Sequence, residues 1–302
     1  MTTAWFNCQA GVAGDMTLAA LVDGGADPDH VARTLGGRGV EGWAMHFERV
    51  QRCGVGATWA NVVVHDDHDA DGHTTHRPVR EIRELPDAAD LPTRVRAGAR
   101  AVFDQLADAD GAIHGVDPGD VELHEVGAVD AIVDVVGVCA ALDSLDVTEV
   151  RCSPIAVGTG SVRSAHGVLP NPAPATVAIL TSAGAPVIGL DATLEVTTPT
   201  GAALMATLAT GFGALPSMSP VAVGYGAGTA DTAGRANVVQ VVIGDATDHG
   251  AEGGDERGAD VLLLEANVDD VTGEVLAHAV TELLAAGAHD AWITPIVMKK
   301  GR

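Results

Sequence analysis

An acidic and glycine-rich stretch at positions 244–259 limits how this chain can fold. It has no apolar periodicity, so it is typical of a linker and adds nothing to a core. On its C-terminal side, 260–302 predicts a strand, a helix and a second strand, too few residues to bury both faces of a sheet. We therefore predict a complete main domain at 1–243 and only the first β-α-β unit of another domain, whose elements are 260–268, 272–286 and 291–298.

The main domain has the pattern of an α/β or α+β fold. Residues 4–8 predict a strand, 9–14 a glycine-containing turn, and Asp15 can cap a helix over 16–23. Apolar residues at helical spacing predict two longer helices, and β-rich runs predict further strands. The helices are expected at 94–107 and 129–145, and the strands at 55–64, 221–228 and 237–243.

The charge balance excludes some classes of partner. Asp and Glu number 41 against 17 Lys and Arg, and the formal net charge of −24 would repel phosphate groups. We therefore expect neither nucleic acid nor an anionic membrane as a partner. The only lysines are Lys299 and Lys300, and this acidic, lysine-poor composition resembles that of halophilic proteins.

The sequence also predicts a cytoplasmic location. No run of about 18 apolar residues predicts a membrane-spanning helix, and the start lacks the pattern of a signal peptide. The four cysteines are too far apart to suggest a zinc knuckle or a disulfide framework, and they fit a reducing compartment. They are Cys8, Cys53, Cys139 and Cys152.

A loop at 65–76 concentrates histidine and aspartate. Four of the 12 histidines of the chain lie in it: His65, His68, His73 and His76. Imidazole suits nickel, copper and zinc, and a flexible cluster can hold such an ion without fixed geometry. We favour metal handling over a merely solvated loop.

A second polar cluster interrupts the apolar segment 122–137. Glu122 and His124 share a face if the chain is extended there, while Asp130 and Asp134 share a helix face at i, i+4. Charged groups beside apolar surface are costly unless they are paired or bound. Ligand chemistry and a structural role, with Asp130 as a cap and Asp134 paired to an arginine, are equally compatible with the pattern.

Two further stretches could bind an anion. Arg163 and His166 lie among glycines, and 197–201 offers hydroxyls and free amides at a helix start. A phosphate-bearing ligand and plain helix capping are both open here. The glycines of 224–228 do not fit a dinucleotide fingerprint.

Five motifs taken together resemble the LarC family of nickel insertases. They occur in the order of the family over nearly the whole chain, and they are Gly11-Val12-Ala13-Gly14-Asp15-Met16, 124–130, 165–170, 198–202, and 267–270 with 294–300. The resemblance implies an enzyme of the lyase class that inserts Ni²⁺ into pyridinium-3,5-bisthiocarboxylic acid mononucleotide. The product is the nickel-pincer cofactor of lactate racemase, and the reaction uses CTP with a divalent metal.

The resemblance also suggests roles for individual residues. His124, Glu125 and Asp130 would hold nickel or remove a pyridinium proton, with Glu122 and Asp134 as further metal ligands. The 65–76 loop would acquire the metal. Binding of the mononucleotide phosphate would fall to Arg163, His166, Thr198, Thr200 and Gly201.

The chain departs from the family pattern in two ways. Asn7 stands where an aspartate is expected, and the C-terminal domain, a ferredoxin-like fold that supplies nucleotide binding, is only begun. A separate chain could complete it, and we also expect a homo-oligomer. The alternative function is a non-enzymatic nickel chaperone or storage protein that uses only the histidine loop.

Overall fold

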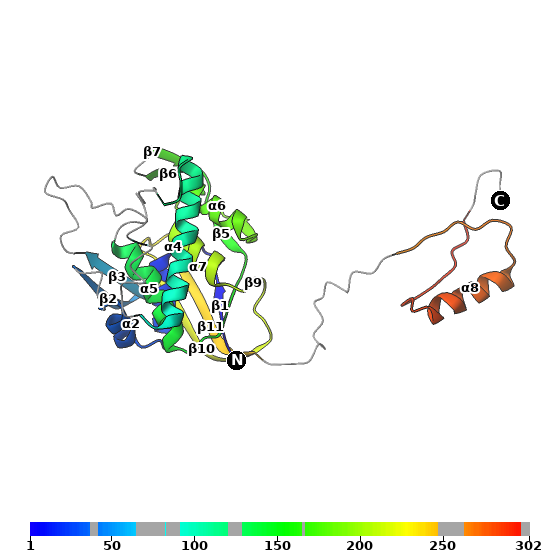
Figure 1. Ribbon diagram of the computed structural model, residues 1–302, viewed down its shortest axis with the longest axis horizontal. Helices are drawn as coiled ribbons and strands as arrows, with labels where there is room; N and C mark the ends of the chain where they lie inside the picture. The colour runs from blue at the N-terminus through cyan, green and yellow to red at the C-terminus, as the bar shows by residue number, and fades with distance from the viewer. Residues whose placement is uncertain are drawn as a thin grey trace. The chain divides into compact units, whose positions relative to one another are not determined.

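The computed structural model describes residues 1–36, 42–64, 82, 91–119, 129–164, 167–246 and 263–296. The chain divides into two compact units, Met1–Asp248 and His249–Arg302. In the first unit, helices pack on a seven-stranded mixed sheet, so the predicted α/β class of the main domain is confirmed (Figure 1).

The sheet combines parallel and antiparallel pairs. Its strand order is β2-β3-β10-β11-β1-β4-β9, in which β1 is antiparallel to β11 and parallel to β4. The strands are β1 (Thr2–Asn7), β2 (Trp43–Arg52), β3 (Val55–Val64), β4 (Glu149–Cys152), β9 (Gly211–Phe212), β10 (Met218–Ala227) and β11 (Val238–Ala246).

Strand β1 shows how the sheet separates the core from its other face. Ala4 and Phe6 are fully buried among core residues, while Thr3, Trp5 and Asn7 alternate with them and make polar contacts on the opposite side. This follows from the two-residue period of a strand. Because β1 runs parallel to β4, the carboxyl ends of both strands lie at the same edge.

Helix α1 lies directly on the sheet, against β3, β10 and β11, and α5 packs on α1, α2 and α4. Figure 1 shows α4, α5 and α7 on the same side of β10 and β11. Most of α5 is buried, as expected for a helix that is apolar on nearly all sides. The helices of this unit are α1 (Gly14–Asp23), α2 (Pro28–Leu35), α4 (Thr93–His114), α5 (Val129–Ser144), α6 (Pro174–Ser182) and α7 (Pro199–Leu208).

The glycines of β10 allow α1 to approach the sheet closely. A Cβ on Gly226 would lie 1.8 Å from the carbonyl oxygen of Met16, and one on Gly224 would lie 2.0 Å from that of Ala20. No side chain fits between the helix backbone and the strand at these points. The glycine-rich pattern of this segment therefore serves helix–sheet packing.

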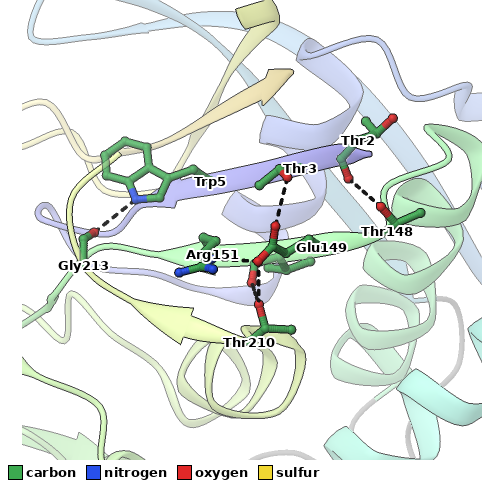
Figure 2. Close-up of polar contacts among 9 residues, drawn as sticks. Thr2, Thr3, Trp5, Thr148, Glu149, Arg151, Thr210 and Gly213 are labelled. Atoms are coloured by element: carbon green, nitrogen blue, oxygen red, sulfur yellow. Dashed lines mark hydrogen bonds and ion pairs between the residues drawn. The ribbon is translucent and has the colours of Figure 1, made fainter. Parts of the chain in front are cut away.

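A polar network joins β1, β4 and the start of β9 (Figure 2). The Glu149 carboxylate accepts hydrogen bonds from Arg151 Nε at 2.8 Å, Thr3 Oγ1 at 3.1 Å and Thr210 Oγ1 at 3.4 Å. The hydrogen bond from Arg151 is the main cause that lowers the pKa of Glu149. Trp5 Nε1 donates to the carbonyl oxygen of Gly213 at 3.1 Å.

Two small sheets complete the first unit. Strands β5 (Ile155–Val157) and β8 (Val187–Gly189) pair in parallel, and β6 (Ser161–Ser164) and β7 (Gly167–Pro170) form an antiparallel hairpin. Among the described residues of the whole chain, no helix has the length and apolar character needed to cross a membrane.

The second unit contains α8 (Gly273–Ala285) between two segments without regular secondary structure, 263–268 and 291–296. The prediction of strands in these segments is wrong for the described residues. A strand needs a hydrogen-bonded neighbour, and no described strand pairs with either segment. Helix α8 has no buried residue. Large apolar side chains of this unit are exposed, including Leu264, Val275, Leu283, Trp292 and Ile293.

Candidate functional site

The loop after β1 passes closely against the start of α7. A Cβ on Gly201 would lie 2.2 Å from the carbonyl oxygen of Val12, and Val12 N donates to Thr197 Oγ1 at 3.2 Å. Gly11 has a positive φ of 106°, a conformation that favours glycine. These contacts fix the start of α1 beside the start of α7, beyond the carboxyl end of β1.

The Asp134 carboxyl group of α5 lies on the first turn of α1. A Cβ on Gly14 would lie 2.6 Å from Asp134 Oδ2, and the backbone N–H of Asp15 is near enough to the Asp134 carboxyl group to act on its pKa. Ala13, the N-cap residue of α1, supplies no side-chain cap. The Asp134 carboxyl group therefore lies against the start of this helix, where the first amides lack intrahelical partners.

The other carboxylate oxygen of Asp134 is buried and has no hydrogen-bond partner within the described part of the chain. Burial is the main cause that raises the pKa of Asp134 well above its ordinary value, and the charges of Asp15 and Asp130 raise it further. The Asp15 N–H acts in the opposite direction but is weaker. The surroundings of Asp134 consequently favour the neutral form of its carboxyl group.

Asp15 is half-buried, and its Oδ1 accepts a hydrogen bond from Met16 N at 2.8 Å. Burial raises the pKa of Asp15 to about 6, against the lowering effect of the Met16 N–H, and the charge of Asp130 raises it further. The sequence pattern predicts Asp15 as a helix cap. The structure instead places it inside the first turn, beside Asp130 and Asp134 of α5.

Asp130 is the exposed member of this group, and its Oδ1 accepts a hydrogen bond from Ala131 N. We call Asp15, Asp130 and Asp134 the carboxyl cluster. Within the described ranges, no arginine, lysine or histidine pairs with any of the three, so the predicted alternative of an Asp134–arginine pair is not found.

Comparison with known proteins identifies the family. Residues 4–302 match the family described as "Nickel insertion protein". The chain belongs to this family. The resemblance predicted from the five motifs is therefore confirmed.

Several relatives match over the whole chain. A protein of Nocardioides sp. named "Pyridinium-3,5-bisthiocarboxylic acid mononucleotide nickel insertion protein" is 46% identical over 302 residues, which are 100% of this chain and 73% of that protein. Two other relatives are each named "Putative nickel insertion protein". The relative from Rhodopirellula baltica is 42% identical over 99% of this chain and 74% of its own length. The relative from Roseiflexus castenholzii is 44% identical over 99% of this chain and 72% of its own length. No solved structure matches the chain.

In this nickel insertion family member, many of the predicted site residues lie outside the described residues. These are His65, His68, His73, His76, Glu122, His124, Glu125 and His166. Of the residues predicted to hold nickel, Asp130 and Asp134 are described. Among the described residues, no group of three or more His, Cys, Asp or Glu side chains could hold a metal ion.

The predicted phosphate-binding residues are partly engaged in local structure. Thr198 is the N-cap of α7, and its hydroxyl accepts a hydrogen bond from Gly201 N at 3.1 Å. Thr200 is buried. Arg163 is exposed on β6. The capping role of Thr198 is therefore observed, and phosphate binding by these residues stays a prediction.

The contact between Gly14 and Asp134 gives a test of the site geometry. Gly14→Ala should destabilise the fold by roughly 1–3 kcal/mol, because the new methyl group would overlap the Asp134 side chain. Combining it with Asp134→Ala should recover part of the loss, since the carboxyl atoms at 2.6 and 3.0 Å are then gone and only Cβ, at 2.8 Å, still obstructs the new methyl group. Chemical denaturation of the four proteins measures the coupling. Strict additivity of the two effects would contradict the contact.

Proposed function

We propose that this chain inserts Ni²⁺ into pyridinium-3,5-bisthiocarboxylic acid mononucleotide, as an enzyme of the lyase class. The observation that carries the proposal is its 46% identity, over its full length, to a relative whose name specifies this substrate. Thiocarboxylate sulfurs are soft donors that favour nickel over hard cations. The protein then has three tasks: to deliver the ion, to orient the substrate and to remove a ring proton.

The described geometry supports a position for this chemistry at the start of α5. His124 and Glu125 precede this helix closely in sequence, and its first turns carry Asp130 and Asp134 beside Asp15. We assign His124 and Glu125, together with Glu122, to the nickel ion as it meets the substrate. The loop residues His65, His68, His73 and His76 would acquire nickel from solution.

The carboxyl cluster is assigned to the same chemistry. Asp134 is a further nickel ligand, and it must lose its proton to bind the metal. Asp130, which is exposed, holds nickel or removes the ring proton.

Binding of the mononucleotide phosphate is assigned to Arg163, His166 and the start of α7. Arg163 is exposed on β6, where its guanidinium group can pair with phosphate. The start of α7 adds the positive end of a helix dipole near Thr200 and Gly201. Thr198 contributes by fixing this helix start through its cap.

Use of CTP with a divalent metal is assigned to a completed C-terminal domain. The relatives extend beyond the region they share with this chain, which spans 73% of the Nocardioides protein. In a ferredoxin-like fold, the two strands of a β-α-β unit leave a place between them for another strand. We propose that further polypeptide, in the same or a separate chain, pairs with 263–268 and 291–296 and covers exposed side chains such as Leu264 and Trp292.

A substitution of His124 tests this function. The chain, supplied with the C-terminal portion of a relative, is incubated with the thiolated mononucleotide, Ni²⁺ and CTP, and the nickel complex is followed by its absorption. His124→Ala should abolish insertion while the circular dichroism spectrum and the thermal unfolding stay those of the unmodified chain. A normal insertion rate in this variant would remove His124 from the mechanism.

A further inference from the structure

Two of the cysteines meet in the core although 144 residues separate them in the sequence. Cys152 is the last residue of β4, and Cys8 directly follows β1. The two strands pair in parallel with Phe6 opposite Cys152, so Cys8 lies just beyond this pair at the same edge of the sheet. The Cys152 thiol donates a hydrogen bond to Cys8 Sγ at 3.5 Å, and both side chains are fully buried. The fold thus brings two free thiols into contact.

The backbone around Cys8 is connected to the starts of α1 and α7. The carbonyl oxygen of Cys8 accepts hydrogen bonds from Ala156 N at 3.0 Å and from Gly11 N at 3.1 Å. Thr197 Oγ1 in turn donates to the carbonyl oxygen of Ala156 at 2.6 Å and accepts from Val12 N at 3.2 Å. One chain of hydrogen bonds therefore runs from Cys8 through β5 to the loop that fixes both helix starts.

We propose that Cys8 and Cys152 are a modification site, which a low-molecular-weight disulfide oxidises to a disulfide bond that locks the loop after β1. Cys8 reacts first, because the next residue, Gln9, is exposed and opening of this one turn uncovers the Cys8 sulfur. Cys152 reacts second, because it belongs to β4, which is held between β1 and β9. The redox state of the pair thereby controls how freely the loop at 9–13 opens.

The closed turn protects the reduced pair. The hydrogen bond with Cys152, and then burial, raise the pKa of Cys8 well above its ordinary value. The thiolate is the reactive form of a cysteine, so Cys8 reacts only while the turn is open. This makes oxidation a measure of how often the start of the loop leaves the core.

The oxidation consists of two thiol–disulfide exchanges. The Cys8 thiol loses its proton, its sulfur attacks one sulfur of the small disulfide, and the small thiolate that leaves takes up a proton. The Cys152 thiolate then attacks the Cys8 sulfur of this mixed disulfide and releases the second small thiol. The two cysteines together lose two protons and two electrons, and the small disulfide gains them. The second exchange is intramolecular, since the two Sγ atoms already lie 3.5 Å apart.

Mass spectrometry after incubation with oxidised glutathione tests the site without nickel or substrate. Cys53 is exposed and would itself take up glutathione, so every protein in the test carries Cys53→Ser. This chain should lose two hydrogen atoms, and peptide mapping should join the Cys8 and Cys152 peptides. Dithiothreitol should restore both thiols. Cys139, which is also buried but lies on α5, is the internal control and should stay a free thiol.

Two further variants test the order of the exchanges. With Cys152→Ala, the second exchange cannot occur, and Cys8 should retain one glutathione. With Cys8→Ala, Cys152 should take up glutathione at least roughly ten times more slowly, because β4 opens less often than the turn. Equal rates of uptake in the two variants would overturn the assignment of Cys8 as the first thiol.

The oxidised chain should also differ physically from the reduced one. Closing so long a loop constrains the unfolded chain, so the Tm should rise by roughly 5–15 °C. Amide exchange of Gly11 and Ala156, whose N–H groups bond to Cys8, should become slower. Both measurements use the native cysteine pair and do not depend on the folding of the alanine variants. Free Cys8 and Cys152 thiols after prolonged incubation of the folded chain with oxidised glutathione would overturn the proposal.

Discussion

Gly226→Ala should leave little folded protein. The added methyl carbon would lie 1.8 Å from the Met16 carbonyl oxygen and 2.5 Å from the Ala20 backbone nitrogen. Both atoms belong to the backbone of α1, so no rotation of a side chain can relieve the overlap. Separating α1 from β10 would open the core under the helix that carries Asp15, at a cost of about 3 kcal/mol or more.

The control for this substitution is Gly189→Ala. Gly189 lies on the exposed strand β8, no atom lies within 4 Å of its added Cβ, and its φ is not in the positive region. Its stability change should stay within roughly 0.5 kcal/mol. Urea denaturation of the two variants gives the comparison. Equal stabilities for Gly226→Ala and Gly189→Ala would contradict the close approach of α1 to the sheet.

Asp134→Asn should raise the stability of the chain at neutral pH, by an amount that grows with pH. Below about pH 4, the carboxyl group is protonated in both the folded and the unfolded chain, so the amide is a close substitute. Above that pH, the unfolded chain ionises Asp134 while the folded chain cannot, because its pKa is raised. The unmodified chain thus loses about 1.4 kcal/mol per pH unit relative to the variant until the raised pKa is reached.

Glu149→Gln should change the stability of the chain in the opposite direction to Asp134→Asn. The pKa of Glu149 is lowered by its hydrogen bond from Arg151 and by those from Thr3 and Thr210 (Figure 2). Its stabilising effect is present above the ordinary carboxyl pKa and is lost as the pH falls through the lowered value. Glu149→Gln should therefore be less stable at neutral pH, with a difference that disappears in acid. Thermal unfolding from pH 3.5 to 8 measures both variants, and parallel pH dependences would contradict the assignment.

The sequence predicts much of the main domain because its signals are local. Apolar spacing locates α5 at Val129–Ser144 and places Asp130 and Asp134 on one face. The apolar pattern of 94–107 predicts only part of α4, which extends over Thr93–His114. A similar local signal, a hydroxyl before Pro199, identifies Thr198 as a cap.

The carboxyl cluster could be found only in part, because its decisive contacts join distant segments. Asp15 follows a glycine turn, a position where capping is the ordinary expectation. The packing of α5 on α1 brings Asp134 to the start of α1. The same packing requires glycine at position 14. A family motif that contains Gly14 and Asp15 is the one sequence signal that pointed to this turn.

The glycines of β10 and the C-terminal strands illustrate the same limit. Gly224 and Gly226 are required by the approach of another element, which no periodicity within 221–228 can reveal. Residues 263–268 and 291–296 have strand propensity, but pairing depends on a neighbouring strand that the described part of this unit does not contain. Propensity alone therefore predicts strands where the structure has irregular chain.

Mass spectrometry of the reaction product tests the central claim most directly. The chain is incubated with pyridinium-3,5-bisthiocarboxylic acid mononucleotide, Ni²⁺ and CTP, with the C-terminal portion of a relative present or omitted. The account predicts a product that contains one nickel atom and lacks the ring proton, formed in quantity when the C-terminal portion is present. Recovery of unmodified mononucleotide from the complete mixture, with the chain folded and nickel in excess, would contradict it.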